Sequence, residues 1–234
     1  MPVLKISGKA SDLTLHLEHP IHLNDDGDCK LALVGFYSEN NIRNLRQDAT
    51  IRFLSNTITF PSGYWTMETM QEHARNYLKQ NAPNVDETKF KIEKANGKVS
   101  IHSPVRFSMD ESISKLLGFE PNVHHEAGTV TAKSSPNLRP VDVIEIHCDI
   151  VHNSYVNVSH HKHTETSILY HFFPSVPQGY KISEVQQFPH YVTLKKGIRR
   201  IQQIRVEITD QNNRILQNDD VENIVYLDLQ IDNK

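Results

Sequence analysis

Histidine is the residue type in this sequence that most readily suggests chemistry, because the 234-residue chain contains 14 of them. His160, His161 and His163 lie together just before Glu165, and imidazole with carboxylate is a donor set that zinc accepts. The cluster falls in a polar stretch with no stiff element to fix tetrahedral geometry, so it predicts adventitious metal affinity rather than a dedicated site. Whether residues 160–163 bind a metal stays open at this stage.

Other candidate groups point away from catalysis. His124-His125-Glu126 is a second loop pair, and His16 and His147 occupy polar positions of alternating segments, where histidine normally faces solvent. The paired carboxylates Asp110-Glu111 and Asp219-Asp220 stand in capping or turn positions, without the buried setting that separates two carboxyl pKa values. The sequence also has no nucleophile-elbow, phosphate-loop or dinucleotide-binding motif. It therefore predicts no enzyme, no catalytic, metal or cofactor-binding residue, and no small-molecule substrate.

The charge of the chain argues against direct nucleic-acid contact. The formal net charge is −3, whereas a nucleic-acid-binding surface usually requires a clear basic excess. One basic cluster, residues 195–200 (KKGIRR), interrupts this balance. We interpret it as a solvated strand entry, with contact to an acidic partner or to packaged nucleic acid as the alternative.

Cysteine content and hydropathy place limits on the cellular setting. Cys29 and Cys148 are too few for a disulfide framework and match no metal spacing, so we expect two buried, unreactive thiols in a reducing compartment. No apolar run approaches the ~18–20 residues that a transmembrane helix needs. Residues 1–5 lack the basic start and apolar centre of a signal peptide, which predicts a protein that is not secreted.

The elements that must position these residues are mostly strands. Apolar and polar residues alternate with a period of two in four segments, which is typical of strands with one buried face. These segments are residues 13–23, 144–150, 204–209 and 225–231. Pro20 predicts an edge strand or a bulge, and the nearly continuous apolar run 30–38 predicts a central strand. Residues 168–182 are expected to form two strands around a turn at Gln178-Gly179.

Two short helices and one tight hairpin complete the prediction. Thr66 is a good N-cap for a helix whose apolar stripe begins at Met67 and ends at Leu78. Ser108 and Glu111 have capping-box spacing for a second helix that ends at Gly118. Asn96-Gly97 between two alternating segments predicts a two-residue hairpin turn.

Two longer polar stretches, Glu120–Pro140 and Asn153–Thr166, are expected to be loops. The first is long enough to mark a domain boundary, but we expect that neither of its flanks buries a sheet alone. We therefore expect an all-β fold, a single β-sandwich with two short helices in connecting loops, which the resemblance described next makes a jelly roll. Residues 1–234 would form that one domain.

The order of short motifs resembles the minor capsid (penton) proteins of Polinton/Maverick elements and adintoviruses, relatives of virophage and adenovirus vertex proteins. The motifs span Thr57–Leu229. They are Phe60–Gly63 before a helix, the Asn-Gly hairpin, Ile113–Phe119, Val143–Asp149, Ile168–Pro174, Gly179–Ile182, Ile208–Asp210 and Arg214–Leu216. Residues 160–163 depart from this pattern.

The resemblance implies a single jelly roll, five copies of which form the vertex of a capsid, beside a double jelly-roll major capsid protein. It carries no catalytic residues. We accordingly expect a structural virion protein that works by touching copies of itself, with the two long loops as candidate interface or outward-facing elements. The alternative is a jelly-roll receptor- or glycan-binding module, with Tyr155 and His161 as its candidate contacts. A metal-dependent cupin enzyme is less compatible, because no predicted strand carries the required His-x-His pattern.

Overall fold

The computed structural model divides the chain into two compact units. Unit 1 comprises Met1–Ile42 and Val141–Lys234, and unit 2 comprises Arg43–Pro140. Each unit has its own cluster of buried apolar side chains, which differs from the single domain expected for residues 1–234. The structure describes residues 3–23, 29–53, 56–82, 86–139, 141–152, 154–158, 162–216 and 224–232.

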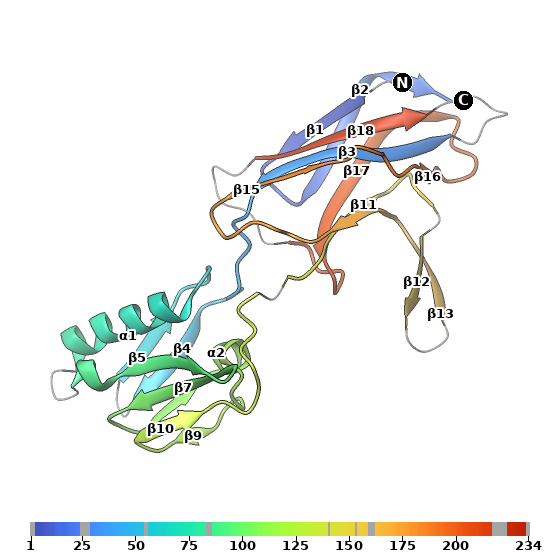
Figure 1. The fold of residues 1–234 in the computed structure, drawn as a ribbon. Helices are drawn as coiled ribbons and strands as arrows, with labels where there is room; N and C mark the ends of the chain where they lie inside the picture. Colours follow the sequence, from blue (N-terminus) through green and yellow to red (C-terminus); the bar gives the residue numbers. More distant parts are fainter. Residues whose placement is uncertain are drawn as a thin grey trace. The chain divides into compact units, whose positions relative to one another are not determined.

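Unit 1 contains two antiparallel sheets (Figure 1). The first sheet has the strand order β1-β18-β3-β15, and β16 also pairs with β3. Its strands are β1 (Val3–Gly8), β18 (Val225–Asp232), β3 (Lys30–Glu39), β15 (Lys181–Val185) and β16 (Val192–Thr193). The apolar run expected as a central strand is β3, which is confirmed in that position between β18 and β15.

The second sheet of unit 1 has the order β14-β11-β17-β2. Its strands are β14 (Ile168–Phe172), β11 (Ile144–Cys148), β17 (Arg200–Asp210) and β2 (Asp12–His22). Pro20 lies in β2, an edge strand whose register with β17 shifts between Ile201 and Gln203, so the predicted edge and irregularity are confirmed.

These two sheets have the strand order of a jelly roll. Eight of the described strands, β1, β2, β3, β11, β14, β15, β17 and β18, follow one another along the chain of unit 1. The first, eighth, third and sixth pair in one sheet, and the fifth, fourth, seventh and second pair in the other. This arrangement of two Greek keys confirms the predicted fold class. Unit 2 is inserted in the chain between the third and fourth of these strands.

The core of unit 1 lies between the two sheets, and it follows from the period-two pattern of their strands. Along β18 the burial alternates strictly, with Leu227, Leu229 and Ile231 fully buried. The rings of Phe36 in β3 and Phe172 in β14 meet with centroids 5.1 Å apart, joining one sheet to the other. Alternation read from sequence thus identified the buried face of each strand correctly.

The segment Asn153–Thr166 is not the loop expected from its composition. It contains the antiparallel pair β12 (Ser154–Val158) and β13 (Lys162–Thr166), with Ser154 opposite Thr166. In the described residues this pair forms a sheet of its own. A strand outside the sandwich sheets need not show the apolar alternation that reveals half-buried strands, so the sequence pattern missed it.

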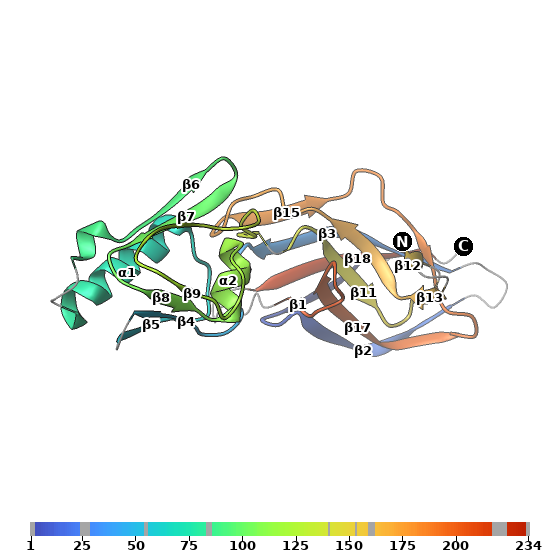
Figure 2. The ribbon, with the colours of Figure 1, turned by 90° about the horizontal axis from the view of Figure 1, so that it is seen from below.

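Unit 2 packs two small sheets with two helices (Figure 1, Figure 2). The sheets have the orders β5-β4-β8-β9 and β10-β7-β6, and α1 contacts β5 and β6 while α2 contacts β4. The elements are β4 (Ala49–Phe53), β5 (Asn56–Phe60), α1 (Met67–Asn81), the 3₁₀ turn η1 (Glu87–Lys89), β6 (Lys91–Ala95), β7 (Lys98–Ser103), β8 (Phe107–Met109), α2 (Glu111–Leu117), β9 (His124–His125) and β10 (Gly128–Thr131). The helices therefore belong to a second core and not to loops of the jelly roll.

The ends of the helices were only partly predictable. Thr66 is the N-cap of α1, as expected, and its side chain accepts a hydrogen bond from the Thr69 amide. The predicted capping box at Ser108 is wrong, because Ser108 lies in β8 and Asp110 caps α2 by accepting from the Ile113 amide at 3.1 Å. Asp110 also accepts from the Thr50 amide of β4, a tertiary contact that sequence spacing does not show.

Both cysteines are buried free thiols, as predicted. Burial raises the pKa of the Cys148 thiol to about 12. Because the thiolate is the reactive form, we expect Cys148 in the folded protein to resist iodoacetamide at pH 8, whereas the urea-unfolded chain is alkylated within minutes. Mass spectrometry of peptides from both samples measures this. Equal modification of Cys148 in the folded and unfolded samples would contradict the buried placement.

Candidate assembly surface

The histidines singled out in the sequence do not converge on one site. His147 is not solvent-facing as predicted, since its side chain is only 12% exposed on β11. Its Nδ1 lies 3.3 Å from Ser167 Oγ and its Nε2 lies 3.1 Å from Thr209 Oγ1. Glu145 Oε2 is 3.5 Å from the same Nε2. Thr209 of β17 and Ser167, just before β14, supply hydroxyl groups that satisfy the ring, so His147 contributes to a structural polar network.

His124 and His125 form β9 in unit 2 and pair with β8, so part of the stretch expected as a loop, Glu120–Pro140, is strand. The His125 ring packs against Phe107 and Phe119, with centroids 4.9 Å and 5.6 Å away. Desolvation, and then the nearby His124, lowers the pKa of His125, which favours the neutral ring. His125 therefore has a packing role in unit 2.

The remaining histidine cluster is only partly visible. His160 and His161 lie outside the described residues, and His163 lies in β13. Among the residues that the structure describes, no group of three histidine, cysteine or acidic side chains lies close enough together to hold a metal ion. Within the same described ranges, no helix is both long and apolar enough to cross a membrane.

The basic cluster 195–200 forms a turn that leads into β17, with its four charged side chains exposed. Gly197 has φ of +86°, the left-handed conformation that such a turn requires. Lys195 donates to the Asp149 carbonyl, and Arg200 donates to the Gln202 side chain at 3.0 Å. This placement agrees with the interpretation of a solvated strand entry.

A different surface of unit 1 has the features of a protein contact. On the outer face of the sheet β1-β18-β3-β15, Tyr37 of β3 lies opposite Tyr226 of β18. With Ile224 they form the apolar part of a hollow of about 440 Å³. Tyr226 is 49% exposed, which is high for an aromatic side chain on a regular strand. The hollow is lined by Tyr37, Ser38, Glu39, Lys181, Ile182, Ser183, Ile224 and Tyr226.

Gly35 allows the Tyr37 ring to lie flat along the sheet. A Cβ atom at Gly35 would stand 2.9 Å from Tyr37 Cε2 and 3.0 Å from its hydroxyl oxygen. The ring therefore occupies the space that any other residue two positions earlier would fill. Beside it, Ser183 of β15 is the cross-strand partner of Tyr37, and Lys181 is the partner of Glu39. An apolar floor is thus bordered by a charged pair, which is the usual arrangement of an interface core and its rim.

Exposed apolar side chains project from the loops of the same unit. Phe188, between β15 and β16, is 88% exposed, and Phe173 and Tyr180, between β14 and β15, are also largely exposed. Large exposed aromatic side chains of this kind are the residue type that anchors contacts with other proteins.

The loop between β14 and β15 is held by hydrogen bonds to Asn40. Its side chain donates to the Val176 carbonyl at 2.7 Å, and its backbone amide donates to the Tyr180 carbonyl at 2.8 Å. The Gly179 amide donates back to the Asn40 carbonyl at 2.9 Å. Because the backbone is fixed before any contact forms, Tyr180 is presented at little entropic cost.

The hollow and the exposed aromatic side chains of unit 1 are suited to binding another molecule, and their residue types do not suggest a catalysed reaction. The hollow presents two phenol rings, two isoleucines and a charged rim, without a nucleophile paired to a base. The protein therefore has a jelly-roll fold, unit 1, with unit 2 inserted in its chain, and the surface of the jelly roll carries exposed aromatic side chains.

Comparison with solved structures finds a protein of the same fold. The mavirus penton protein superposes with a TM-score of 0.51 at 13% sequence identity, covering 99% of this chain and 99% of that one. A chain of the Sputnik virophage aligns at 12% identity and a TM-score of 0.49, covering 96% of this chain and 93% of that one. No protein-family model matches the sequence. No curated protein matches it either.

The aromatic hollow was not predicted from the sequence, although the residues that form it carry two recognisable signals. Tyr37 and Tyr226 are 189 positions apart, and only the register between β3 and β18 brings them together. The signals available were a glycine inside the apolar run at Gly35 and a tyrosine at a polar position of the last alternating strand. A glycine inside a strand often marks a close approach, here by a ring of the same strand.

Proposed function

We infer that this protein is a structural capsid subunit that acts by assembly and not by catalysis. The observation that carries the inference is the likeness in fold to a mavirus penton protein along 99% of both chains. The name of that protein indicates the vertex of a virus particle. We assign this chain the same role: five copies in a closed ring, located at the capsid vertex of the virion.

The ring would need a heterologous contact, in which one surface of a copy meets a different surface of the next. The exposed Phe188 and the hollow around Tyr37 and Tyr226 are two such surfaces, and they lie at different places on unit 1. We place Phe188 of one copy in the hollow of its neighbour. Burying an aromatic anchor in a pocket with a polar rim is the common form of an interface hot spot.

Two further assignments belong to this proposal. The outer partner of the ring would be a double jelly-roll major capsid protein, and the sequence would be related to the penton proteins of Polinton/Maverick elements and adintoviruses. Both follow the order of motifs in the sequence, and the likeness to a virophage protein supports the broader relation. The alternative function, a jelly-roll receptor- or glycan-binding module, would not require a ring.

Interface variants test the contact. Phe188→Ser and Tyr226→Ser should each weaken the ring by about 2 kcal/mol or more, because each removes one side of a buried aromatic contact. Sedimentation velocity over a dilution series would show the ring giving way to slower species at higher concentration than in the wild type. Tyr64→Ser is the control, since Tyr64 is an exposed tyrosine in unit 2.

The outcome can contradict the assignment of surfaces. Rings of unchanged stability in both Phe188→Ser and Tyr226→Ser would show that the contact lies elsewhere. Circular dichroism of each variant should match the wild type, because both side chains are exposed and contribute little to folding.

A further inference from the structure

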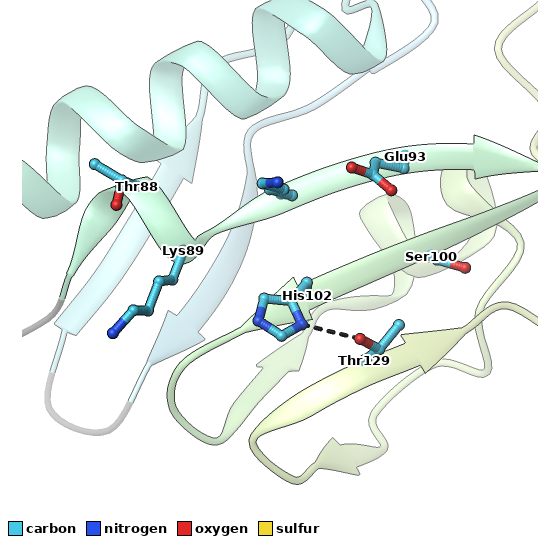
Figure 3. A pocket seen from close by; sticks show the side chains of 7 residues that line it. Thr88, Lys89, Glu93, Ser100, His102 and Thr129 are labelled. Carbon is cyan, nitrogen blue, oxygen red and sulfur yellow. Dashed lines mark hydrogen bonds between the residues drawn. The ribbon is translucent and has the colours of Figure 1, made fainter.

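Unit 2 carries a polar sheet face that the proposed assembly does not use. In the sheet β10-β7-β6, Ile92, Val99 and Ile101 point into the core of unit 2 and are buried. Because successive side chains of a strand point to opposite faces, the residues between these buried positions lie on the opposite face of the sheet. Two cross-strand rows result, Lys91–His102–Thr129 and Glu93–Ser100–Thr131. Figure 3 labels His102 and Thr129 of the first row and Glu93 and Ser100 of the second.

This face is a hollow whose polar groups are held in place. It encloses about 430 Å³ and is lined by Thr88, Lys89, Lys91, Glu93, Ser100, His102 and Thr129. His102 Nδ1 lies 2.9 Å from Thr129 Oγ1, which fixes the plane of the ring (Figure 3). Ser100 Oγ lies 2.9 Å from Thr131 Oγ1 in the second row.

The rim formed by η1 is also ordered by its own contacts. Thr88 Oγ1 donates to Asp86 Oδ1 at 2.6 Å, and Lys89 Nζ lies 3.2 Å from Asp86 Oδ2. The rim and the two rows together present hydroxyl, imidazole and ammonium groups toward one open space (Figure 3). Groups that are already oriented lose less entropy when they bind a ligand.

The charge of the β6–β7 hairpin is positive although the whole chain is negative. Residues 91–103 contain three lysines and one glutamate, whereas the formal net charge of the chain is −3. A local cationic surface attracts anions even when the total charge has the other sign. The lining residues include no phenylalanine, tyrosine, tryptophan or aliphatic side chain, and His102 supplies a single ring, which argues against an apolar ligand and against a run of stacked nucleic-acid bases.

We propose that this face binds a sulfated glycan. Ammonium groups such as that of Lys91 would pair with sulfate, and the hydroxyls of Ser100 and Thr129 would hydrogen-bond sulfate oxygens and sugar hydroxyls. Glu93, the one acidic group in the lining, would accept hydrogen bonds from sugar hydroxyls. An open sheet face suits an extended polymer, whose neighbouring residues continue beyond the hollow, better than a small metabolite that needs enclosure.

The site is independent of the ring, because all of its residues lie in unit 2 and the proposed ring contact lies in unit 1. It would give a capsid protein a means of attachment to a polysaccharide-covered surface. A failure of either proposal is therefore distinguishable from a failure of the other.

Calorimetric titration of the full chain with a heparin-derived hexasaccharide tests the proposal. We expect binding that weakens as salt rises, and a dissociation constant about tenfold higher in Lys91→Ala and again in Thr129→Val. Thr129→Val keeps the shape of the side chain and removes only its hydroxyl. Lys115→Ala is the matched control, because Lys115 is an exposed lysine of unit 2 on α2 that pairs with Glu111.

Three outcomes would overturn the proposal. They are no heat of binding at millimolar hexasaccharide, equal loss of affinity in Lys115→Ala, and equally tight binding of a single-stranded oligonucleotide of the same charge. Thermal melts that match the wild type would show that the Lys91 and Thr129 variants are folded. Unchanged sedimentation of these variants would show that any loss of glycan binding is not a loss of assembly.

Discussion

Replacing Phe53 by alanine is expected to lower the free energy of unfolding of unit 2 by about 3–5 kcal/mol. Phe53 in β4 is 1% exposed, and its ring lies 5.4 Å from that of Phe90 and 6.0 Å from that of Phe107 between centroids. Removing the ring leaves a cavity between Phe90 and Phe107, which come from different segments of the chain and cannot both move to fill it.

The single tryptophan provides the measurement. Trp65 lies in unit 2, with its ring 5.3 Å from that of Phe60, so its fluorescence during urea denaturation reports on that unit. Lys115→Ala is the control and should change the free energy by no more than about 0.5 kcal/mol, since Lys115 is an exposed residue of the same unit. An unchanged midpoint in Phe53→Ala would mean that unit 2 has no tightly packed core of its own.

Gly118→Ala should destabilise unit 2 by about 2–5 kcal/mol, through two separate costs. Gly118 ends α2 with φ of +83°, a conformation that disfavours any side chain. A Cβ there would also stand 2.2 Å from the Ser134 carbonyl oxygen and 3.0 Å from that of Ser135. The Ser134 amide donates to the Gly118 carbonyl at 3.1 Å, so the two segments cannot separate without losing that hydrogen bond.

Gly97→Ala separates the two costs. Gly97 has φ of +77°, nearly the same backbone conformation, but a Cβ there meets only Ser135 Oγ at 3.9 Å. We expect this variant to lose about 1–2 kcal/mol in the same urea experiment. If Gly97→Ala and Gly118→Ala were equally destabilised, the close approach of Ser134 to the helix end would be wrong.

The jelly roll could be predicted because its strands bury one face each. Period-two alternation in residues 144–150, 204–209 and 225–231 marks β11, β17 and β18, and the continuous apolar run marks β3. Loops between such strands are free to vary, so the pattern says nothing about which strands pair. The expectation of a jelly roll came from the resemblance to capsid proteins, and the strand order of the two sheets is known only from the structure.

The second unit was harder to predict, because its sheets are short and share one core with helices. β8, β9 and β10 have three, two and four residues, too few to display a period. The stretch Glu120–Pro140 is a candidate domain boundary by its length, and one division between the units falls at its end, after Pro140. The expectation of one domain depends on the premise that neither flank of this stretch buries a sheet alone, whereas residues 43–140 have a buried apolar cluster of their own.

The candidate surfaces depend on tertiary pairing, which a single sequence does not encode in any local pattern. Lys91, His102 and Thr129 come from three strands and meet only through two registers. The histidine-rich segment drew attention by composition, whereas the polar hollow of unit 2 contains a single histidine among common surface residues. Clusters of one residue type are visible in a sequence, but mixed sites become visible only when the strands are paired.

Native mass spectrometry of the purified protein tests the central claim most directly. The account predicts a closed ring with five times the chain mass of 26.9 kDa, persisting at micromolar concentration and physiological salt. A protein that stays at the mass of a single chain at high concentration would contradict a function based on contact between copies.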